Sequence, residues 1–182
     1  MNDLILLALL LDGPQHGYAL KKQAGMLTGK HEMHNNLVYP LLRRFVRLGW
    51  VRERTTAGKR GQTRHLYSMT NSGRRALIER LSDYGPADEH HSPAFELRVG
   101  LFAVLGADTR DEILRRRAEY LRSQDQKLAN LQEAMDLGEF GGEVVRFKRE
   151  RAAAEMVWIE RLARMSGKTH EESGREKRRV KG

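Results

Sequence analysis

The stretch from Asn36 to Leu48 constrains the fold of this chain more than any other. Its apolar residues recur at helical spacing, which predicts a helix with one buried face. These residues are Leu37, Val38, Leu41, Leu42, Phe45 and Leu48. Proline lacks a backbone N–H and is tolerated only in the first turn, so Pro40 places the helix start near Asn36. The opposite face is polar and carries Tyr39, Arg43 and Arg44.

Two short segments of alternating character follow this helix, at residues 50–55 and 63–69. The residues between them include Gly58 and Gly61, so we predict a β-hairpin. Alternate side chains of a strand point to opposite faces. One face of the hairpin suits a core and holds Val51, Tyr67 and Met69, whereas the other suits solvent or phosphate and holds Arg52, Arg54 and Arg64.

Three further helices complete the amino-terminal half. The apolar run 4–11 predicts the first, and residues 17–27 predict the second, with Tyr18, Leu20 or Ala24, and Leu27 facing inward. Residues 70–73 cap a helix that runs from Arg74 to about Tyr84. The order of three helices, two strands and a helix describes a winged helix-turn-helix. We therefore predict a mainly α protein with a DNA-binding domain over residues 1–85.

The positive charge of the chain is concentrated in this half. Residues 1–85 hold 14 Lys and Arg and 6 Asp and Glu, a net charge of +8, whereas residues 86–182 hold 19 and 18, a net charge of +1. Such an excess favours a polyanionic partner, because each phosphate contact releases condensed counterions. A membrane surface is the rival polyanion, but no basic helix with an exposed apolar face stands out. The third interpretation is that the excess positive charge serves only to keep the protein soluble.

The second half predicts two long helices. Gly85-Pro86 marks a hinge, and a helix capped by residues 108–111 follows it. The apolar positions of this helix are Leu114, Ala118, Leu121, Leu128, Leu131 and Met135, and those of the next are Val144, Phe147, Ala154, Trp158, Leu162 and Met165. These apolar stripes must be buried against each other, against the helix over 94–105, or against a second subunit. We expect a helical dimerisation domain over 86–168 and a charged, disordered tail over 169–182.

Several motifs together resemble the PadR family of bacterial transcription regulators. They are His16-Gly17-Tyr18, Leu37-Val38-Tyr39-Pro40-Leu41-Leu42-Arg43-Arg44, Leu48-Gly49-Trp50-Val51, a Gly-Arg-Gly wing and Tyr67-Ser68-Met69-Thr70-Asn71-Ser72-Gly73. They occur in order over residues 4–82, which is more specific than any one of them. The resemblance implies a winged-helix domain, a homodimer formed by the carboxy-terminal helices, and repression relieved by a small molecule.

The expected DNA-binding residues lie on the third helix, the wing and the second helix. They are Asn35, Asn36, Tyr39, Arg43, Arg44, Lys59, Arg60, Arg64, Lys21 and Lys22. Asn36 has the groups to bond an adenine edge, whereas the arginines suit phosphates. The competing interpretation is that these are solvated surface charges and, for Tyr39, a packed aromatic ring. Trp158 is expected in the core or dimer contact, or in the wall of an effector pocket.

Other function classes find little support. The chain has no cysteine, which excludes disulfides and thiol chemistry, and His31 and His34 do not have the spacing of a zinc-binding His-Glu-x-x-His motif. We expect no cofactor, no metal and no catalytic activity. The apolar run is too short to span a bilayer and lacks signal-peptide features, so we expect a cytoplasmic protein. The alternative function is a non-specific architectural protein that binds DNA or RNA.

Overall fold

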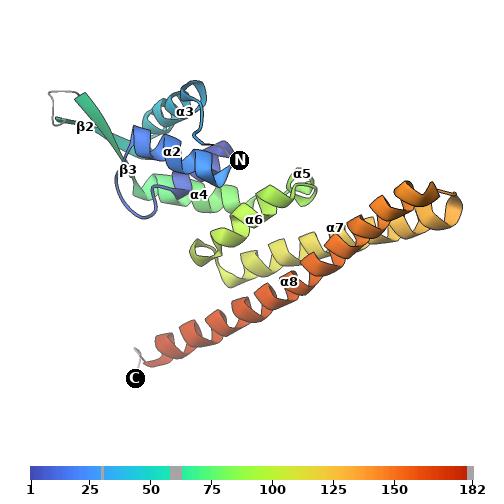
Figure 1. Ribbon diagram of the computed structural model, residues 1–182. Coiled ribbons are helices and arrows are strands. Elements are labelled where there is room, and N and C mark those ends of the chain that lie inside the picture. Colours follow the sequence, from blue (N-terminus) through green and yellow to red (C-terminus); the bar gives the residue numbers. More distant parts are fainter. Residues whose placement is uncertain (30, 58–62, 180–182) are drawn as a thin grey trace. The chain divides into compact units, whose positions relative to one another are not determined.

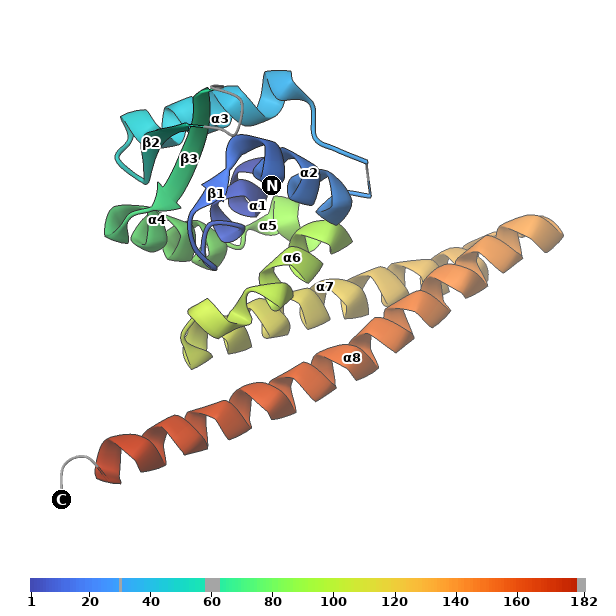
Figure 2. The same cartoon turned by 60° about the vertical axis from the view of Figure 1, so that its left-hand side comes forward.

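The computed structural model describes residues 1–29, 31–57 and 63–179, with residues 168–179 as backbone only. The chain divides into two compact units, residues 1–83 and 84–182. Figures 1 and 2 show the helices and strands of each unit. Lys59 and Arg60, expected at the tip of the wing, lie outside the described residues.

The amino-terminal unit has the element order predicted from the sequence, with one short strand added. It contains α1 (Asn2–Ala8), β1 (Gln15–His16), α2 (Gly17–Leu27), α3 (Asn35–Arg47), β2 (Val51–Ala57), β3 (Thr63–Met69) and α4 (Asn71–Ser82). The sheet is antiparallel with strand order β1-β3-β2. The winged-helix fold class is therefore confirmed, and β1 is the element that the sequence pattern does not predict, because two residues carry no periodicity.

The core of this unit forms where the apolar faces of the four helices meet. Its most deeply buried side chains are Leu6, Leu7, Leu10, Leu20, Leu42, Phe45, Leu77 and Leu81. On α3 the buried positions Val38, Leu42 and Phe45 follow the predicted stripe, although Leu37 and Leu48 at its edges are exposed. Because one face of α3 is fixed in the core, its polar face must point outward.

The predicted orientation of α2 was partly wrong. Leu20 and Ala24 are buried as expected, but Tyr18 and Leu27 are 66% and 62% exposed. Successive residues of a helix lie about 100° apart around its axis, so a stripe through Gly17, Leu20 and Ala24 turns Tyr18 away from the core. Leu27 is the last residue of the helix, where the chain leaves the core.

A network of hydrogen bonds joins the start of α4 to the turn between α3 and β2. The Thr70 hydroxyl caps α4 by accepting from the Gly73 amide at 3.0 Å, and it contacts the carbonyl oxygen of Gly49 at 2.7 Å. Ser72 also donates to that oxygen, at 2.7 Å. A side chain at residue 73 would overlap the carbonyl oxygen of Trp50, so glycine is required there. The end of α3 and the start of the hairpin are thus both held at the start of α4.

The carboxy-terminal unit is a pair of long antiparallel helices with short helices packed beside them (Figure 1). It contains α5 (Pro86–Glu89), α6 (Ser92–Gly100), a 3-10 turn (Phe102–Val104), α7 (Ala107–Ala134) and α8 (Gly138–Arg179). The predicted helix over 94–105 therefore ends early, at Gly100. Arg117 of α7 is buried, and its guanidinium binds the Glu155 carboxylate at 2.7 Å, the Ser92 hydroxyl at 2.7 Å and the Glu89 carbonyl oxygen.

The apolar stripe predicted for α8 is largely in solvent. Val144, Phe147 and Met165 are more than half exposed, and Val145 and Ile159 are the apolar residues buried there instead. On α7, Leu114, Ala118 and Leu121 are buried as expected, whereas Leu131 and Met135 are exposed. The two helices of one chain therefore leave apolar surface uncovered.

α8 continues to Arg179 and so runs through most of the segment 169–182, for which disorder stays a prediction. This stretch contains Glu, Lys and Arg, which have high helix propensity, and it contains no proline. Residues 180–182 lie outside the described part of the chain.

Candidate nucleic-acid interface

The outward face of α3 carries most of the predicted site residues. Asn35 and Asn36 are its first two residues and are exposed, as are Arg43, Arg44 and Arg47 further along. Neither residue caps the helix, because its N-cap residue is His34 and no side chain caps it. Their amide groups are therefore not used in capping.

Tyr39 is half-buried and joins α3 to the start of α2. A Cβ atom at residue 17 would lie 3.1 Å from the Tyr39 ring and 3.2 Å from the Tyr67 ring, so glycine allows both rings to approach the backbone. Tyr39 therefore packs against the fold on one side and is open on the other. The packed ring expected as one alternative is present, and a contact of Tyr39 with DNA stays a prediction.

A hydrogen-bonded cluster lies on the same face of the hairpin as Tyr67. The Tyr67 hydroxyl donates to Glu53 Oε1 at 3.1 Å, and Nδ1 of His65 lies 2.6 Å from the same oxygen. Burial and then the Glu53 carboxylate raise the pKa of Tyr67 to about 12. Glu53 is thus an acidic group on the face of the hairpin opposite to Arg52, Arg54 and Arg64. Its partners come from the neighbouring strand, so no local sequence pattern reveals it.

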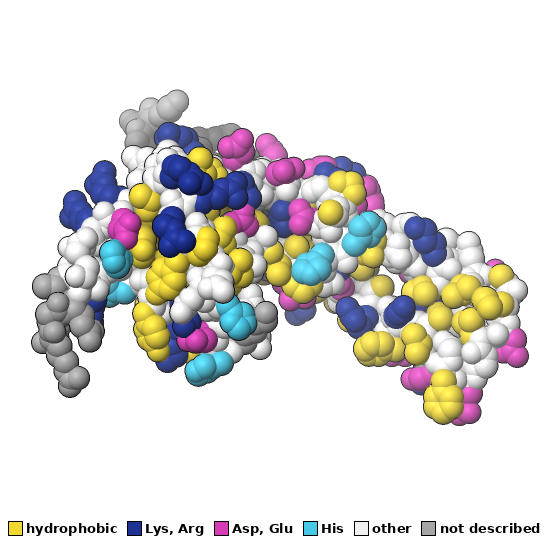
Figure 3. Space-filling view, turned by 90° about the horizontal axis from the view of Figure 1, so that it is seen from above, with side chains coloured by type: hydrophobic (Ala, Val, Ile, Leu, Met, Phe, Trp, Pro, Cys, Tyr) yellow, Lys and Arg dark blue, Asp and Glu magenta, His cyan; other side chains and the backbone are white. Residues whose placement is uncertain are grey.

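The opposite face of the hairpin is cationic. Arg52, Arg54 and Arg64 are exposed there, as the strand alternation predicts. Within the described residues none of them pairs with a carboxylate, and the same holds for Arg43, Arg44 and Arg47 on α3. Figure 3 shows Lys and Arg side chains gathered over the amino-terminal unit. Arginines without carboxylate partners keep their donors available for an anionic ligand.

The two lysines of α2 differ from each other. The Lys21 ammonium lies 2.8 Å from Glu32, and its hydrogen bond holds the pKa of that carboxyl below its usual range. Lys22 is exposed. The structure therefore places Lys22 among the available cations and engages Lys21 within the protein.

A pocket of about 420 Å³ opens between α2, α3 and β3. It is lined by His16, Gly17, Tyr18, Ala19, Tyr39, Thr63, Arg64 and His65. The structure therefore brings Tyr39 and Arg64, which lie 25 residues apart, to one concave site. No sequence pattern predicts the pocket, since its walls come from four separate elements, β1, α2, α3 and β3.

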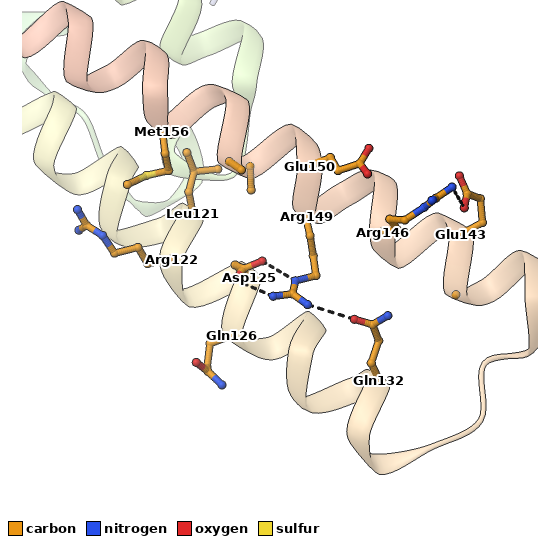
Figure 4. Close-up of a pocket in the computed structure, with 13 residues that line it drawn as sticks. Leu121, Arg122, Asp125, Gln126, Gln132, Glu143, Arg146, Arg149, Glu150 and Met156 are labelled. Atoms are coloured by element: carbon orange, nitrogen blue, oxygen red, sulfur yellow. Dashed lines mark hydrogen bonds and ion pairs between the residues drawn. The ribbon is translucent and has the colours of Figure 1, made fainter.

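A second hollow of about 980 Å³ lies between α7 and α8 in the carboxy-terminal unit. Figure 4 shows Arg149 reaching across it, with Nε donating to Asp125 at 2.7 Å and a terminal nitrogen donating to Gln132 at 3.3 Å. Leu121 and Met156 supply apolar wall. Trp158 does not line this hollow; its ring packs edge-on against Phe95 with 5.6 Å between centroids.

Comparison with a family model identifies the amino-terminal unit. Residues 6–79 match the model described as the transcriptional regulator PadR-like family. This unit belongs to the PadR-like family of transcriptional regulators. No curated protein matches the chain.

The chain is also similar to several solved structures. A PadR family transcriptional regulator from Eggerthella lenta is 29% identical, with 45% of this chain and 70% of that one covered and a TM-score of 0.40. PadR from Bacillus subtilis in complex with operator DNA is 21% identical, with 90% and 98% covered and a TM-score of 0.44. A transcriptional regulator from Clostridium thermocellum is 22% identical, with 45% and 80% covered and a TM-score of 0.41.

Proposed function

We propose that this PadR-like regulator acts in the cytoplasm as a homodimeric repressor that binds an inverted-repeat operator and is released by a small aromatic effector. The observation that carries the DNA-binding part is the set of exposed arginines without carboxylate partners on α3 and the hairpin. Within the described residues, no helix combines the length and apolar character needed to cross a bilayer.

The polar face of α3 suits the major groove, which is about 12 Å wide and admits a helix. Asn35, Asn36 and Tyr39 lie in the first turns, the part of a recognition helix that reaches base edges. Arg43 and Arg44 lie further along and suit backbone phosphates. The arginines of the hairpin extend the same cationic surface onto neighbouring phosphates.

The direct test uses the DNA upstream of the protein's own gene, together with a duplex that the protein selects from a randomised library (the selected duplex). Wild type should bind both, with an affinity that falls steeply as salt rises. Arg43→Ala/Arg44→Ala should fold normally and lose at least about tenfold in affinity.

The matched control is Arg74→Ala/Arg75→Ala on α4, which removes the same charge from two exposed positions of the same unit. If both double variants weaken binding equally, net charge rather than α3 drives binding. Equal affinity of wild type for the selected duplex and a random duplex at physiological salt would favour the non-specific architectural protein instead.

The homodimer is supported by the apolar surface of the carboxy-terminal unit. Its exposed large side chains are Leu131, Met135, Phe140, Val144, Phe147, Val157 and Met165. Phe140 is 83% exposed and lies at the start of α8, close to the turn from α7. Figure 3 shows hydrophobic side chains gathered at this end of the two long helices. A second copy would cover such a surface.

Sedimentation tests the dimer. Wild type should sediment as a dimer, and Phe140→Asp/Phe147→Asp should sediment as a folded monomer with weaker operator binding. Glu139→Ala is the control, because it changes an exposed side chain beside Phe140 without removing apolar surface. A monomeric wild type would contradict the proposal.

The effector and the sign of regulation need separate measurements. Trp158 and Trp50 are the two tryptophans, so a Trp50→Phe background isolates the fluorescence of Trp158. An aromatic effector should quench that signal and lower operator affinity, as aromatic walls suit planar ligands. Deleting the gene should raise expression from its own promoter. A panel of aromatic compounds without quenching would favour a regulator without a ligand.

A further inference from the structure

An acidic residue lies in the angle between α3 and the hairpin. A hollow of about 620 Å³ opens there, which we call the α3–hairpin hollow. Its walls include Val46 of α3 and three residues of the hairpin, Glu53, Thr55 and His65. Among its described lining residues Glu53 is the only carboxylate. Arg52 also borders the hollow, although strand alternation assigns it to the opposite face of the hairpin.

Strand register explains why Glu53 lies on the side of α3. Glu53 is opposite Tyr67, and Thr55 is opposite His65. Directly opposed residues share a face of a sheet, and so do alternate residues of a strand. These side chains therefore lie on the face that also carries the buried Val51. This face of the hairpin is directed toward the core and α3, and Glu53 is its acidic group.

One side of α3 is turned toward this face. The rings of Tyr39 and Tyr67 approach the same point of the backbone at the start of α2, and Val46 shares the α3–hairpin hollow with Glu53. Arg43 lies four residues after Tyr39 and three before Val46, so it projects from the same side of the helix. Burial and Glu53 raise the pKa of Tyr67, and the charge of Arg43 opposes that rise. Arg43 and Glu53 thus stand on the two walls of one angle.

No lysine or arginine neutralises Glu53 within the described residues. Its Oε1 accepts from the Tyr67 hydroxyl at 3.1 Å and lies 2.6 Å from Nδ1 of His65. Its Oε2 has no hydrogen bond among the described residues, and the side chain is 32% exposed. The carboxylate is therefore held in position with one oxygen free. A phosphate that enters the hollow would meet a fixed like charge, which is unfavourable.

We infer that Glu53 is a specificity-determining residue whose carboxylate keeps DNA phosphates out of the angle between α3 and the hairpin. The inference rests on the proposed DNA-binding function. Non-specific binding consists almost entirely of phosphate contacts, so a fixed negative charge weakens the binding of random duplexes most. A duplex selected in the presence of Glu53 avoids this repulsion, because its backbone passes outside the hollow or it offers the carboxylate a base amino group.

The experiment compares Kd for the selected duplex and for a random duplex of equal length, at one salt concentration and at about pH 8, where histidine is ordinarily neutral. Glu53→Gln removes the charge but keeps an acceptor for Tyr67 and His65. It should bind the random duplex about three- to tenfold tighter and the selected duplex within about twofold of wild type. Glu53→Thr suits a strand, adds no amide and should behave in the same way.

Two matched variants separate the position of the charge from other effects. Glu79→Gln removes the same charge from an exposed position of α4. Tyr67→Phe removes a hydrogen bond to Glu53 but leaves its charge. Both variants should keep the wild-type ratio of the two Kd values.

Three results would overturn the inference and leave operator binding intact. They are an unchanged ratio in either Glu53 variant, an equal loss of the ratio in Glu79→Gln, and an equal loss in Tyr67→Phe. The second would mean that net charge sets the ratio, and the third that hydrogen bonding does. A wild type that binds neither duplex would overturn the proposed function as well.

Discussion

The two units of this protein use arginine in opposite ways. In the carboxy-terminal unit Arg98, Arg115, Arg116, Arg117, Arg146 and Arg149 each bind a carboxylate. In the amino-terminal unit, of the arginines that the structure describes, Arg80 pairs with Asp3, whereas those of α3 and the hairpin have no carboxylate partner. The net charges of +8 for residues 1–85 and +1 for residues 86–182 agree with this difference, because the second half holds nearly as many acidic as basic residues.

The arginines of the two units also differ in how deeply they are buried. A guanidinium removed from water needs its charge and its donors satisfied, and Arg117 meets that need with Glu155, Ser92 and the Glu89 carbonyl group. The rings of Phe95 and Tyr120 also lie close to Arg117, with their centroids 5.4 and 5.3 Å from its guanidinium carbon. The exposed arginines of α3 remain hydrated and carry no such cost. Arginine content alone therefore does not identify a binding surface.

The largest effect should come from breaking the buried pair. Arg117→Ala leaves the Glu155 carboxylate without its main partner, which should cost about 3–5 kcal/mol of unfolding free energy. Urea unfolding followed by Trp158 fluorescence in a Trp50→Phe background measures it. Arg115→Ala, at an exposed position of the same helix, is the control and should leave the midpoint unchanged. A loss below about 0.5 kcal/mol for Arg117→Ala would mean that the pair is dispensable.

A smaller effect should distinguish two buried tyrosines, one in each unit. Tyr67→Phe removes a hydrogen bond to Glu53 and should cost about 1 kcal/mol. The buried Tyr84 hydroxyl has no hydrogen-bond partner within the described residues, so Tyr84→Phe should cost nothing at neutral pH. Urea unfolding of the two variants checks this. Equal losses would indicate that Tyr84 is hydrogen-bonded in solution.

Alkaline pH gives an independent check on the same pair. Burial raises the pKa of both hydroxyls to about 12, above the ordinary value of 10.0. Since the unfolded chain ionises first, neither hydroxyl lowers the free energy of unfolding through ionisation below pH 10, and both lower it as the pH rises toward about 12. In each Phe variant, the free energy of unfolding should therefore fall less steeply over this pH range than it does in wild type.

A few-fold effect on DNA affinity should separate unpaired from paired cations. Arg52→Ala removes an exposed arginine of the hairpin, and the slope of log affinity against log salt should become shallower by about 0.9. Arg146→Ala removes an arginine that Glu143 holds at 2.5 Å and should leave the slope unchanged. Anisotropy with the selected duplex measures both. Equal slopes in the two variants would remove the distinction between the units.

The smallest effect is expected at the hollow between α7 and α8. Arg149 holds the pKa of the Asp125 carboxyl below its usual range through a hydrogen bond, but both side chains are well exposed. Exposed pairs contribute little because water screens them and side-chain entropy opposes them. Arg149→Ala should therefore not move the thermal midpoint measurably. A clear destabilisation would show that the pair organises the two helices.

Local pattern was sufficient for much of the amino-terminal unit. The helix from Asn35, the hairpin and the Thr70 cap follow from periodicity, proline position and cap chemistry, all of which are local. The orientation of Tyr18 was wrong because α2 is short, and a stripe one position away fits its sequence almost equally well.

Long-range pairing explains most of what the sequence could not supply. Glu53 meets Tyr67 and His65 only after the hairpin sets its register, and Lys21 meets Glu32 only after the chain turns back. Arg117 and Glu155 lie 38 residues apart on different helices. The lining of the pocket at His16 has the same origin, because no local pattern brings four elements together.

The bonds that Thr70 and Ser72 make to Gly49 have a mechanical consequence. They brace the turn between α3 and β2 against the start of α4, which limits how far the end of α3 can shift relative to the hairpin. In the proposed complex with operator DNA, this stiffness leaves bending and twisting to the double helix. Operators with readily kinked pyrimidine–purine steps would then be favoured even at base pairs the protein never touches.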